Sequence, residues 1–274
     1  APGLDDKVLT AWNAMTIKGL AKTSVALGEK RWLEVAQRCA DFLQEHLFDG
    51  DTLYASWQGQ ARFPAYLDDY ANLMDALLTL LSAEWRESDA AFVLQLADRA
   101  VARFQDPEHG GFFFTHDRGE LFHQPKPTMD DALPPGNGVI VQALIQLGHL
   151  FGNKDYLEAA ERALYWANGR MLQYPAGHCS MLCALEQYLE PSEQIIIRGP
   201  REQIEEWLET ASGGFAPNRS CYAIPYDGVS TLPDYLPRLV SIEEQKRTVA
   251  YRCENFSCSL PIRSLDELKQ ALAK

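Results

Sequence analysis

Two kinds of helix alternate along the first 190 residues. One kind is amphipathic, because apolar side chains recur at helical spacing while charged residues fill the opposite face. The other kind is apolar nearly all round, which a helix tolerates only when protein surrounds it. The alternation therefore predicts outer and inner helices in turn. The outer runs lie within 32–43, 93–104 and 156–167, and the inner runs are Val8 to Leu27, Tyr66 to Leu81 and Val139 to Leu150.

The inner runs show a faint repeat in which small residues fall at equivalent places. Successive copies are about 57 and 67 residues apart, enough for one helical hairpin and a connecting loop. Both long loops are rich in aromatic residues, have strand-like character and lead into the N-terminal end of an inner helix. A further apolar run, Gly177 to Leu189, predicts one more inner helix. The first part of the chain is thus expected to be a series of helical hairpins from an α/α barrel.

The pattern changes after Glu190 and Pro191. EQIIIRG is typical of a buried strand, and SCYAIPY and TVAYRC predict two more strands. Helices are predicted over 201–212 and 265–273, the second one introduced by Ser264 and Glu267 in capping-box spacing. Residues 191–274 therefore predict a small α/β unit, and residues 1–190 the helical domain.

Charge and composition exclude several partners. The formal net charge of -13 opposes binding to nucleic acid or to anionic membrane surfaces. No apolar stretch approaches the roughly 20 residues that cross a bilayer, and the start, APGLDDKVL, lacks the pattern of a signal peptide. A cytoplasmic location is expected by default. Gly-rich phosphate loops and a Gly-x-Ser-x-Gly element are absent, so no cofactor is expected and a serine hydrolase is disfavoured.

The scattered cysteines predict reduced, structural thiols. For Cys253 and Cys258 a zinc site or a redox pair stays an alternative, but free thiols are expected. His109, His116 and His123 lie seven apart, a spacing that by itself supplies no metal geometry, so no metal site is predicted.

Paired carboxylates and aromatic residues stand at the three inner-helix entrances. If the inner helices run parallel, these residues gather in a polar cleft at one mouth of the barrel. Carboxylates accept hydrogen bonds from hydroxyls or move protons, and aromatic faces stack on sugar rings. The candidate acid/base residues are Asp68, Asp69, Asp130 and Asp131, and the candidate ligand-holding residues are Asp6, Trp12, Asn13, Tyr66, Tyr70, Lys126 and Asn137.

A structural role competes with the chemical one at these positions. Acidic residues in a first helical turn are favoured by the macrodipole and by capping, which is the preferred interpretation of Asp5, Asp6, Asp130 and Asp131 taken singly. Asp68 and Asp69 are better site candidates, because they lie one turn inside an apolar helix between two tyrosines.

Several longer motifs resemble a known family. LDDKVLTAWNAMTIKGLA, AYLDDYANLMDALLTL, GGFFFT, KPTMDDALPPGNGV and VAYRCENFSCSLPI resemble the C-terminal portion of the thioredoxin-fused six-hairpin barrel family, the spermatogenesis-associated, thioredoxin-like proteins. The resemblance implies an (α/α)6 toroid, similar to N-acylglucosamine 2-epimerase and six-hairpin glycosidases, behind a thioredoxin-like domain. Residues 1–190 would then be the second half of the barrel, and the chain a fragment or truncated relative.

The resemblance leaves two functions open. The first is a carbohydrate-binding or carbohydrate-active barrel. Epimerases of this fold use histidines that project into the barrel, and His178 is the nearest candidate to the inner-helix entrances. Glycosidase-like carboxylate chemistry therefore fits these residues better than epimerase-like chemistry. The second is a non-catalytic interaction module that works with the thioredoxin-like domain and the first barrel half. In either case self-association is expected, because the flanks of the first and last inner helices carry apolar side chains: Val8, Ala11, Met15, Leu182 and Leu185.

Overall fold

Antiparallel helical hairpins form the larger part of the molecule. The computed structural model describes residues 3–116, 122–190, 193–214, 216, 219–232, 246–254 and 256–273. A single 3-10 turn, Pro175–Gly177, precedes the last helix of this part. The helices are α1 (Thr10–Leu27), α2 (Lys30–Leu47), α3 (Leu67–Ala83), α4 (Glu87–Phe104), α5 (Gly136–Phe151), α6 (Lys154–Gln173) and α7 (Cys179–Leu189).

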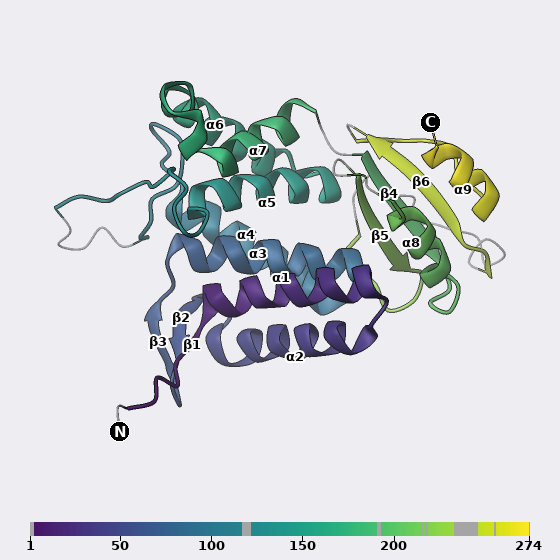
Figure 1. The fold of residues 1–274 in the computed structure, drawn as a ribbon, viewed down its shortest axis with the longest axis horizontal. Coiled ribbons are helices and arrows are strands. Elements are labelled where there is room, and N and C mark those ends of the chain that lie inside the picture. The colour runs from purple at the N-terminus through teal and green to yellow at the C-terminus, as the bar shows by residue number, and fades with distance from the viewer. Residues whose placement is uncertain are drawn as a thin grey trace.

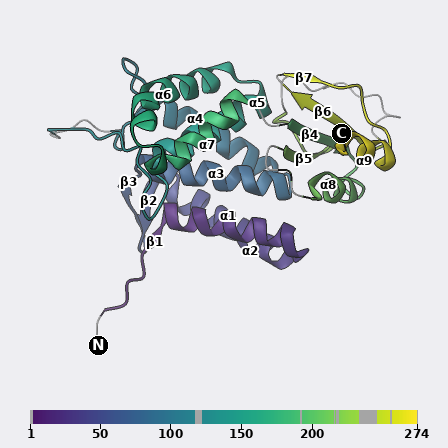
Figure 2. The same cartoon turned by 45° about the horizontal axis from the view of Figure 1, so that its top comes forward.

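Inner and outer helices alternate as predicted. α1, α3, α5 and α7 pack side by side in that order, while α2, α4 and α6 each pack against the inner helix that precedes them and return the chain to the same end (Figures 1 and 2). Nearly every residue of α3 and α5 is buried or partly buried, as their apolar sequences require. None of the helices in the described ranges is both long and apolar enough to cross a membrane.

Two glycines allow the inner helices to approach closely. A Cβ atom on Gly138 of α5 would overlap the side chain of Ser180 in α7, and one on Gly136 would overlap Asp68 in α3. Gly138 is one of the small residues of the sequence repeat, and at this position the repeat marks a helix contact.

Short strands connect the helices at the N-terminal end of the inner layer. β1 (Val8–Leu9), β2 (Tyr54–Trp57) and β3 (Ala61–Pro64) form an antiparallel sheet in the order β1-β2-β3. The strand-like character of the first long loop is thereby confirmed. The described part of the second loop includes an isolated bridge between Gln105 and Phe112.

A small α/β unit lies against the other end of the inner helices (Figure 1). β4 pairs with β5 in parallel and with β6 in antiparallel fashion, and the sheet order is β5-β4-β6-β7. The predicted strands and helices of this part are confirmed, whereas β7 was not predicted. The elements are β4 (Glu193–Gly199), α8 (Ile204–Ser212), β5 (Arg219–Pro225), β6 (Val249–Glu254), β7 (Ser257–Cys258) and α9 (Leu265–Leu272).

The sheet joins two apolar cores. On one face Ile195 and Ile197 pack with Trp207 and Leu268 of α8 and α9, and on the other Ile196 and Tyr222 join the helical core. Successive side chains of a strand point to opposite faces of the sheet, so a strand that is apolar throughout is buried on both faces. The division of the chain into residues 1–190 and 191–274 stays a prediction.

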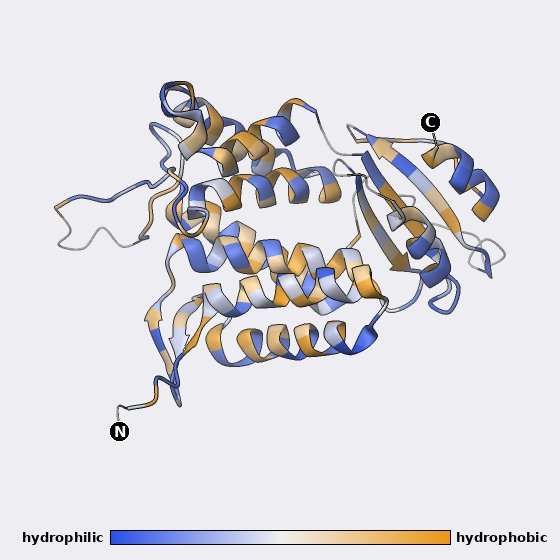
Figure 3. Ribbon diagram, viewed as in Figure 1, coloured by the Kyte–Doolittle hydropathy of each residue, from blue (hydrophilic) through white to orange (hydrophobic). Residues whose placement is uncertain are grey.

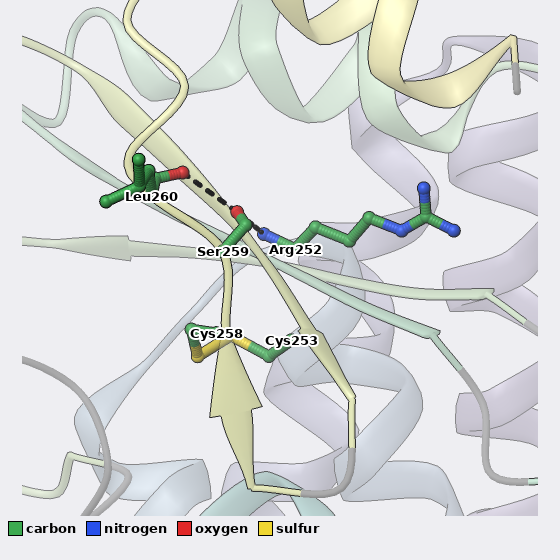
Figure 4. The surroundings of a disulfide bond; sticks show 5 residues. All are labelled: Arg252, Cys253, Cys258, Ser259 and Leu260. Carbon is green, nitrogen blue, oxygen red and sulfur yellow. Dashed lines mark hydrogen bonds between the residues drawn. A yellow bond between two sulfur atoms is a disulfide. The ribbon is translucent and has the colours of Figure 1, made fainter.

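The prediction that Cys253 and Cys258 are free thiols is wrong. The two residues face each other across β6 and β7 and form a disulfide with an S–S distance of 2.05 Å (Figure 4). A tight turn between the strands brings their Cα atoms to 4.0 Å, and Phe256 within it stacks on His149 of α5. Cys39, Cys179, Cys183 and Cys221 are free.

The apolar flanks expected to drive self-association are partly covered. Val8, Leu182 and Leu185 pack against the helical core, and Ala11 and Met15 are also half-buried. Self-association stays a prediction.

Candidate functional site

Asp69 ties the entrances of two inner helices together. Its Oδ1 accepts a hydrogen bond from the backbone N–H of Ala11 in α1 at 3.0 Å, and its Oδ2 accepts one from Tyr66 at 3.0 Å. The residue is 6% exposed. Burial raises the pKa of Asp69 to about 7 against these two hydrogen bonds, and the charge of Asp68 adds to the rise. Asp69 is therefore a carboxyl that exchanges its proton near neutral pH while holding α1 against α3.

Asp68 makes the equivalent link to the next inner helix. Its Oδ1 accepts a 2.9 Å hydrogen bond from the N–H of Gly136, the first residue of α5. Burial raises the pKa of Asp68, and the hydrogen bond from Gly136 opposes the rise. Unlike Asp69, Asp68 is only half-buried. The backbone N–H groups at a helix start have no partner within the helix, so a carboxylate stabilises them.

Asp130 repeats this arrangement at the last inner helix. Its Oδ2 accepts a hydrogen bond from the N–H of Ser180 in the first turn of α7 at 3.0 Å. Asp68, Asp69 and Asp130 thus each cap a neighbouring inner helix, and the structure brings the predicted entrances together. The prediction that Asp68 and Asp69 lie one turn inside the helix is wrong, because α3 begins at Leu67 and both are in its first turn. The adjacent Asp131 is exposed.

Two of the three predicted aromatic residues are accessible at this end. Tyr66 is 39% exposed and stacks on Phe114, with ring centroids 4.9 Å apart and an interplanar angle of 10°. Trp12 is 62% exposed. In contrast, Tyr70 is 1% exposed: its hydroxyl accepts a hydrogen bond from Leu53 N–H at 3.1 Å and its ring meets Phe104 edge-on. Tyr70 thus packs in the core.

Asn137 and Lys126 hold the second long loop in place. The buried Asn137 accepts a hydrogen bond from Phe112 N–H at 2.8 Å and donates to the carbonyls of Phe112 and Pro127. Lys126 Nζ donates to Asp106 Oδ2 at 2.6 Å and to Gly110 O at 2.8 Å, and lies over the ring of Trp166. Neither side chain is directed to a free surface.

The prediction did not single out Asp106, the partner of Lys126. Burial opposes its ionisation, but hydrogen bonds from Lys126 and from the backbone N–H groups of His109 and Glu108 lower the pKa of Asp106 to about 2. Asp106 follows an outer helix in a stretch whose sequence is that of an ordinary turn, so the sequence does not show that it pairs with Lys126.

Asn13 and Asp6 lie at the first entrance. Asn13 of α1 donates to the carbonyl of Leu9, the residue before the helix, at 2.8 Å, and its Oδ1 accepts a weak hydrogen bond from the Cys39 thiol at 3.6 Å. Asp6 is exposed and accepts a hydrogen bond from Gln58 at 2.6 Å. Asn13 is thus engaged in the helix packing, whereas Asp6 can be reached from solvent.

His178 is buried and both of its ring nitrogens have partners. Nδ1 lies 2.8 Å from Tyr174 O, and Nε2 lies 3.2 Å from the hydroxyl of Thr128. In the described ranges no group of three or more His, Cys, Asp or Glu residues is placed to hold a metal ion.

A polar stripe along α3 was missed. Asn72, Asp75, Thr79 and Ser82 follow Asp68 at spacings of three and four residues, and all are partly exposed where the residues between them are buried. Lys18 of α1 pairs with Asp75. The sequence contains the signal for this stripe, because polar residues at this spacing share one face of a helix. It is hard to see because the segment as a whole is rich in apolar residues.

Comparison with known proteins extends the fold assignment. No family model matches the chain. The chain is 30% identical over 285 residues to mouse spermatogenesis-associated protein 20, covering 98% of the chain and 36% of the mouse protein. It therefore spans about a third of the length of this relative.

Two solved structures share the fold of the helices. They are the unsaturated glucuronyl hydrolase of Bacillus sp. GL1 and a GH76 alpha-mannanase of Bacteroides thetaiotaomicron. The first superposes with a TM-score of 0.54 at 12% identity, covering 70% of this chain and 62% of the hydrolase. The second has a TM-score of 0.53 at 13% identity, covering 69% of this chain and 55% of the mannanase. The chain is therefore related by sequence to the mouse spermatogenesis-associated protein 20 over 98% of the chain and 36% of that protein, and its helices have the fold of the six-hairpin glycosidase-like barrels.

Proposed function

We propose that the N-terminal ends of the inner helices form a carbohydrate-binding surface. The observation that carries the proposal is Asp68, a half-buried carboxyl with a raised pKa two residues from the exposed, stacked ring of Tyr66. An aromatic face next to a carboxyl suits a sugar ring, because one contacts C–H groups and the other hydroxyls. The two enzymes that share the fold are named for reactions on glucuronyl and mannan substrates, which agrees with a sugar ligand.

The carboxylates of this surface divide into two groups. Asp69 and Asp130 are positioning residues, since their oxygens accept backbone hydrogen bonds from neighbouring helices. Asp68 has one oxygen bound to Gly136, and its other oxygen makes no hydrogen bond to the described residues, so it is available to a ligand. A carboxyl with a raised pKa can donate a proton, as a general acid in glycoside hydrolysis does, and the exposed Asp131 is the candidate for a second carboxylate.

Calorimetric titration with a panel of mono- and disaccharides tests the proposal. We expect Tyr66→Ala and Asp68→Asn to weaken the binding of a sugar about tenfold, the effect of losing one stacking or hydrogen-bonding contact. Tyr165→Ala is the matched control, since Tyr165 is an exposed aromatic residue on the outer helix α6. Absence of binding across the panel by the unaltered chain would remove the proposal.

A non-catalytic interaction module is the second candidate. It is favoured by α1, which carries the exposed apolar side chains Trp12, Val25 and Leu27. Under this alternative the chain, with no affinity for any sugar, would bind a thioredoxin-like domain, and Trp12→Ala would weaken that complex.

A further inference from the structure

A polar cavity of about 720 Å³ lies at the other end of the inner helices. Its walls are the middle and C-terminal parts of α1 and α3, the middle of α5, a residue of α7, and the facing parts of α8 and β5. The volume is in the range of sites for small molecules. We propose that this cavity binds a sugar-sized, polyhydroxylated molecule that carries one negative charge. The site shares none of its lining residues with the surface proposed above.

Polar stripes of three inner helices converge on this cavity. Asp75, Thr79 and Ser82 recur on one face of α3, Gln142 and Gln146 lie one turn apart on α5, and Lys18 and Lys22 do so on α1. Polar positions interrupt the apolar ones at intervals along α3 and α5 (Figure 3). Because both helices are otherwise buried, side chains of this kind are placed on the one face that lines a polar space.

The cavity offers hydrogen-bonding groups that the protein itself leaves unused. Gln187 Oε1 is buried and has no hydrogen-bond partner among the residues that the structure describes. Gln142 uses its amide nitrogen on the carbonyls of Gly138 and Ser180, which leaves its oxygen as an acceptor. Thr79 and Ser82 donate to helix carbonyls, so their oxygens can also accept. A ligand rich in hydroxyl donors would satisfy these acceptors, and leaving a buried one unpaired costs stability.

The charges of the lining select an anion of low charge. Lys18 is paired with Asp75, and Arg219 is paired at 2.9 Å with Glu193, which also pairs with Arg252. Lys22 has no acidic partner among the described residues, so the cavity keeps at least one positive charge that no carboxylate in those ranges offsets. A ligand with one carboxylate would be neutralised there, whereas a polyanion would be repelled by the chain's net charge of -13.

The apolar part of the lining fits the same class of ligand. Ala21 and Leu78 come from α1 and α3, and Ala211 and Tyr222 close the cavity from the α/β unit. Sugars present C–H surfaces between their hydroxyls, so small apolar patches beside amides and hydroxyls suit them.

Calorimetric titration of residues 1–274 with D-glucuronate, D-galacturonate and D-gluconate, each beside its neutral counterpart, tests the proposal. We expect one or more of the acids to bind more tightly than its counterpart. Lys22→Glu should weaken that binding at least tenfold and leave neutral sugars within twofold, because it reverses the unpaired charge. Gln146→Leu should weaken the binding of the acid and of the neutral sugars alike. Lys154→Glu, the same charge change at an exposed position on α6, is the control and should have no effect.

The same titration separates this site from the surface at the opposite end. Tyr66→Ala should leave binding of the acid to the cavity unchanged, even if it abolishes binding of a neutral sugar to the surface that contains Tyr66. The proposal is overturned if none of the three acids binds, or if Lys22→Glu binds the acid as well as the unaltered chain does. It is also overturned if Tyr66→Ala, and not Lys22→Glu, removes the binding. Lys22 is exposed on α1, so Lys22→Glu is expected to remain folded, which its thermal unfolding would show.

Discussion

The carboxylate of Asp68, in the first turn of α3, accepts a 2.9 Å hydrogen bond from the backbone N–H of Gly136, the residue that begins α5. This contact requires glycine, because any Cβ at position 136 would overlap the carboxylate. With Asp69 and Asp130 it forms a set of capping contacts that fix the starts of successive inner helices relative to one another.

Replacing Gly136 therefore tests the capping contact. Gly136→Ala should lower the free energy of unfolding by about 1–3 kcal/mol, through overlap with Asp68 and loss of its hydrogen bond. Gly169→Ala is the matched control, since Gly169 lies within α6 with open space around it and alanine there should stabilise by about 0.5–1 kcal/mol. Urea unfolding of both variants measures the difference, and equal effects would contradict the argument.

The raised pKa of Asp69 predicts how stability changes with pH. A folded-state pKa of about 7, above the ordinary value of 3.8, means that the stability contributed by the neutral carboxyl is complete below 3.8 and lost as pH rises through 7. Between pH 6 and pH 8 the free energy of unfolding of the unaltered chain should fall by about 1.4 kcal/mol more than that of Asp69→Asn, because the asparagine side chain does not titrate. Urea unfolding of both proteins at the two pH values checks this. A difference that stays constant with pH would show that Asp69 is ionised throughout.

Most of the fold could be predicted from sequence because the two helix types differ in pattern. The run from Tyr66 to Leu81, for example, corresponds to α3 at Leu67–Ala83, whose apolar residues are buried. Two-residue strands carry too little pattern, and β7 was missed for that reason. The disulfide was missed with it, because only the pairing of β6 with β7 places Cys258 opposite Cys253.

The candidate site could be predicted less fully. The sequence indicates that carboxylates gather at the inner-helix entrances, and they do so. It cannot indicate that the partner of Asp69 is the N–H of Ala11, 58 positions away, because every residue except proline carries the same backbone group. For the same reason Tyr70 and Asn137 could not be recognised as buried residues that support neighbouring loops.

The ion pair of Lys126 and Asp106 is expected to contribute measurably to stability. Both side chains are largely buried, so Lys126→Met removes the partner of a buried carboxylate and should cost about 2–4 kcal/mol at pH 7. The lowered pKa of Asp106 means that its contribution is complete above 3.8 and is lost as pH falls through about 2. Lys30→Met is the control, because the pair of Lys30 with Glu205 is exposed and should contribute nothing measurable. If urea unfolding finds the two variants equally stable, the buried pair has no special role.

The disulfide predicts which thiols react with an alkylating reagent. In the folded chain without reductant, Cys179 and Cys183 are exposed and should be modified first, while the buried Cys221 and the half-buried Cys39 should react slowly. Under denaturing conditions without reductant all four should be modified, and reduction before alkylation should add the two sulfurs of Cys253 and Cys258. Peptide mass analysis distinguishes these states. The serine variant of either bridged cysteine is the control, because it frees the other cysteine and should make it reactive without reductant. Modification of both Cys253 and Cys258 in the unreduced, denatured chain would show that the bridge does not form in solution and would restore the prediction of free thiols.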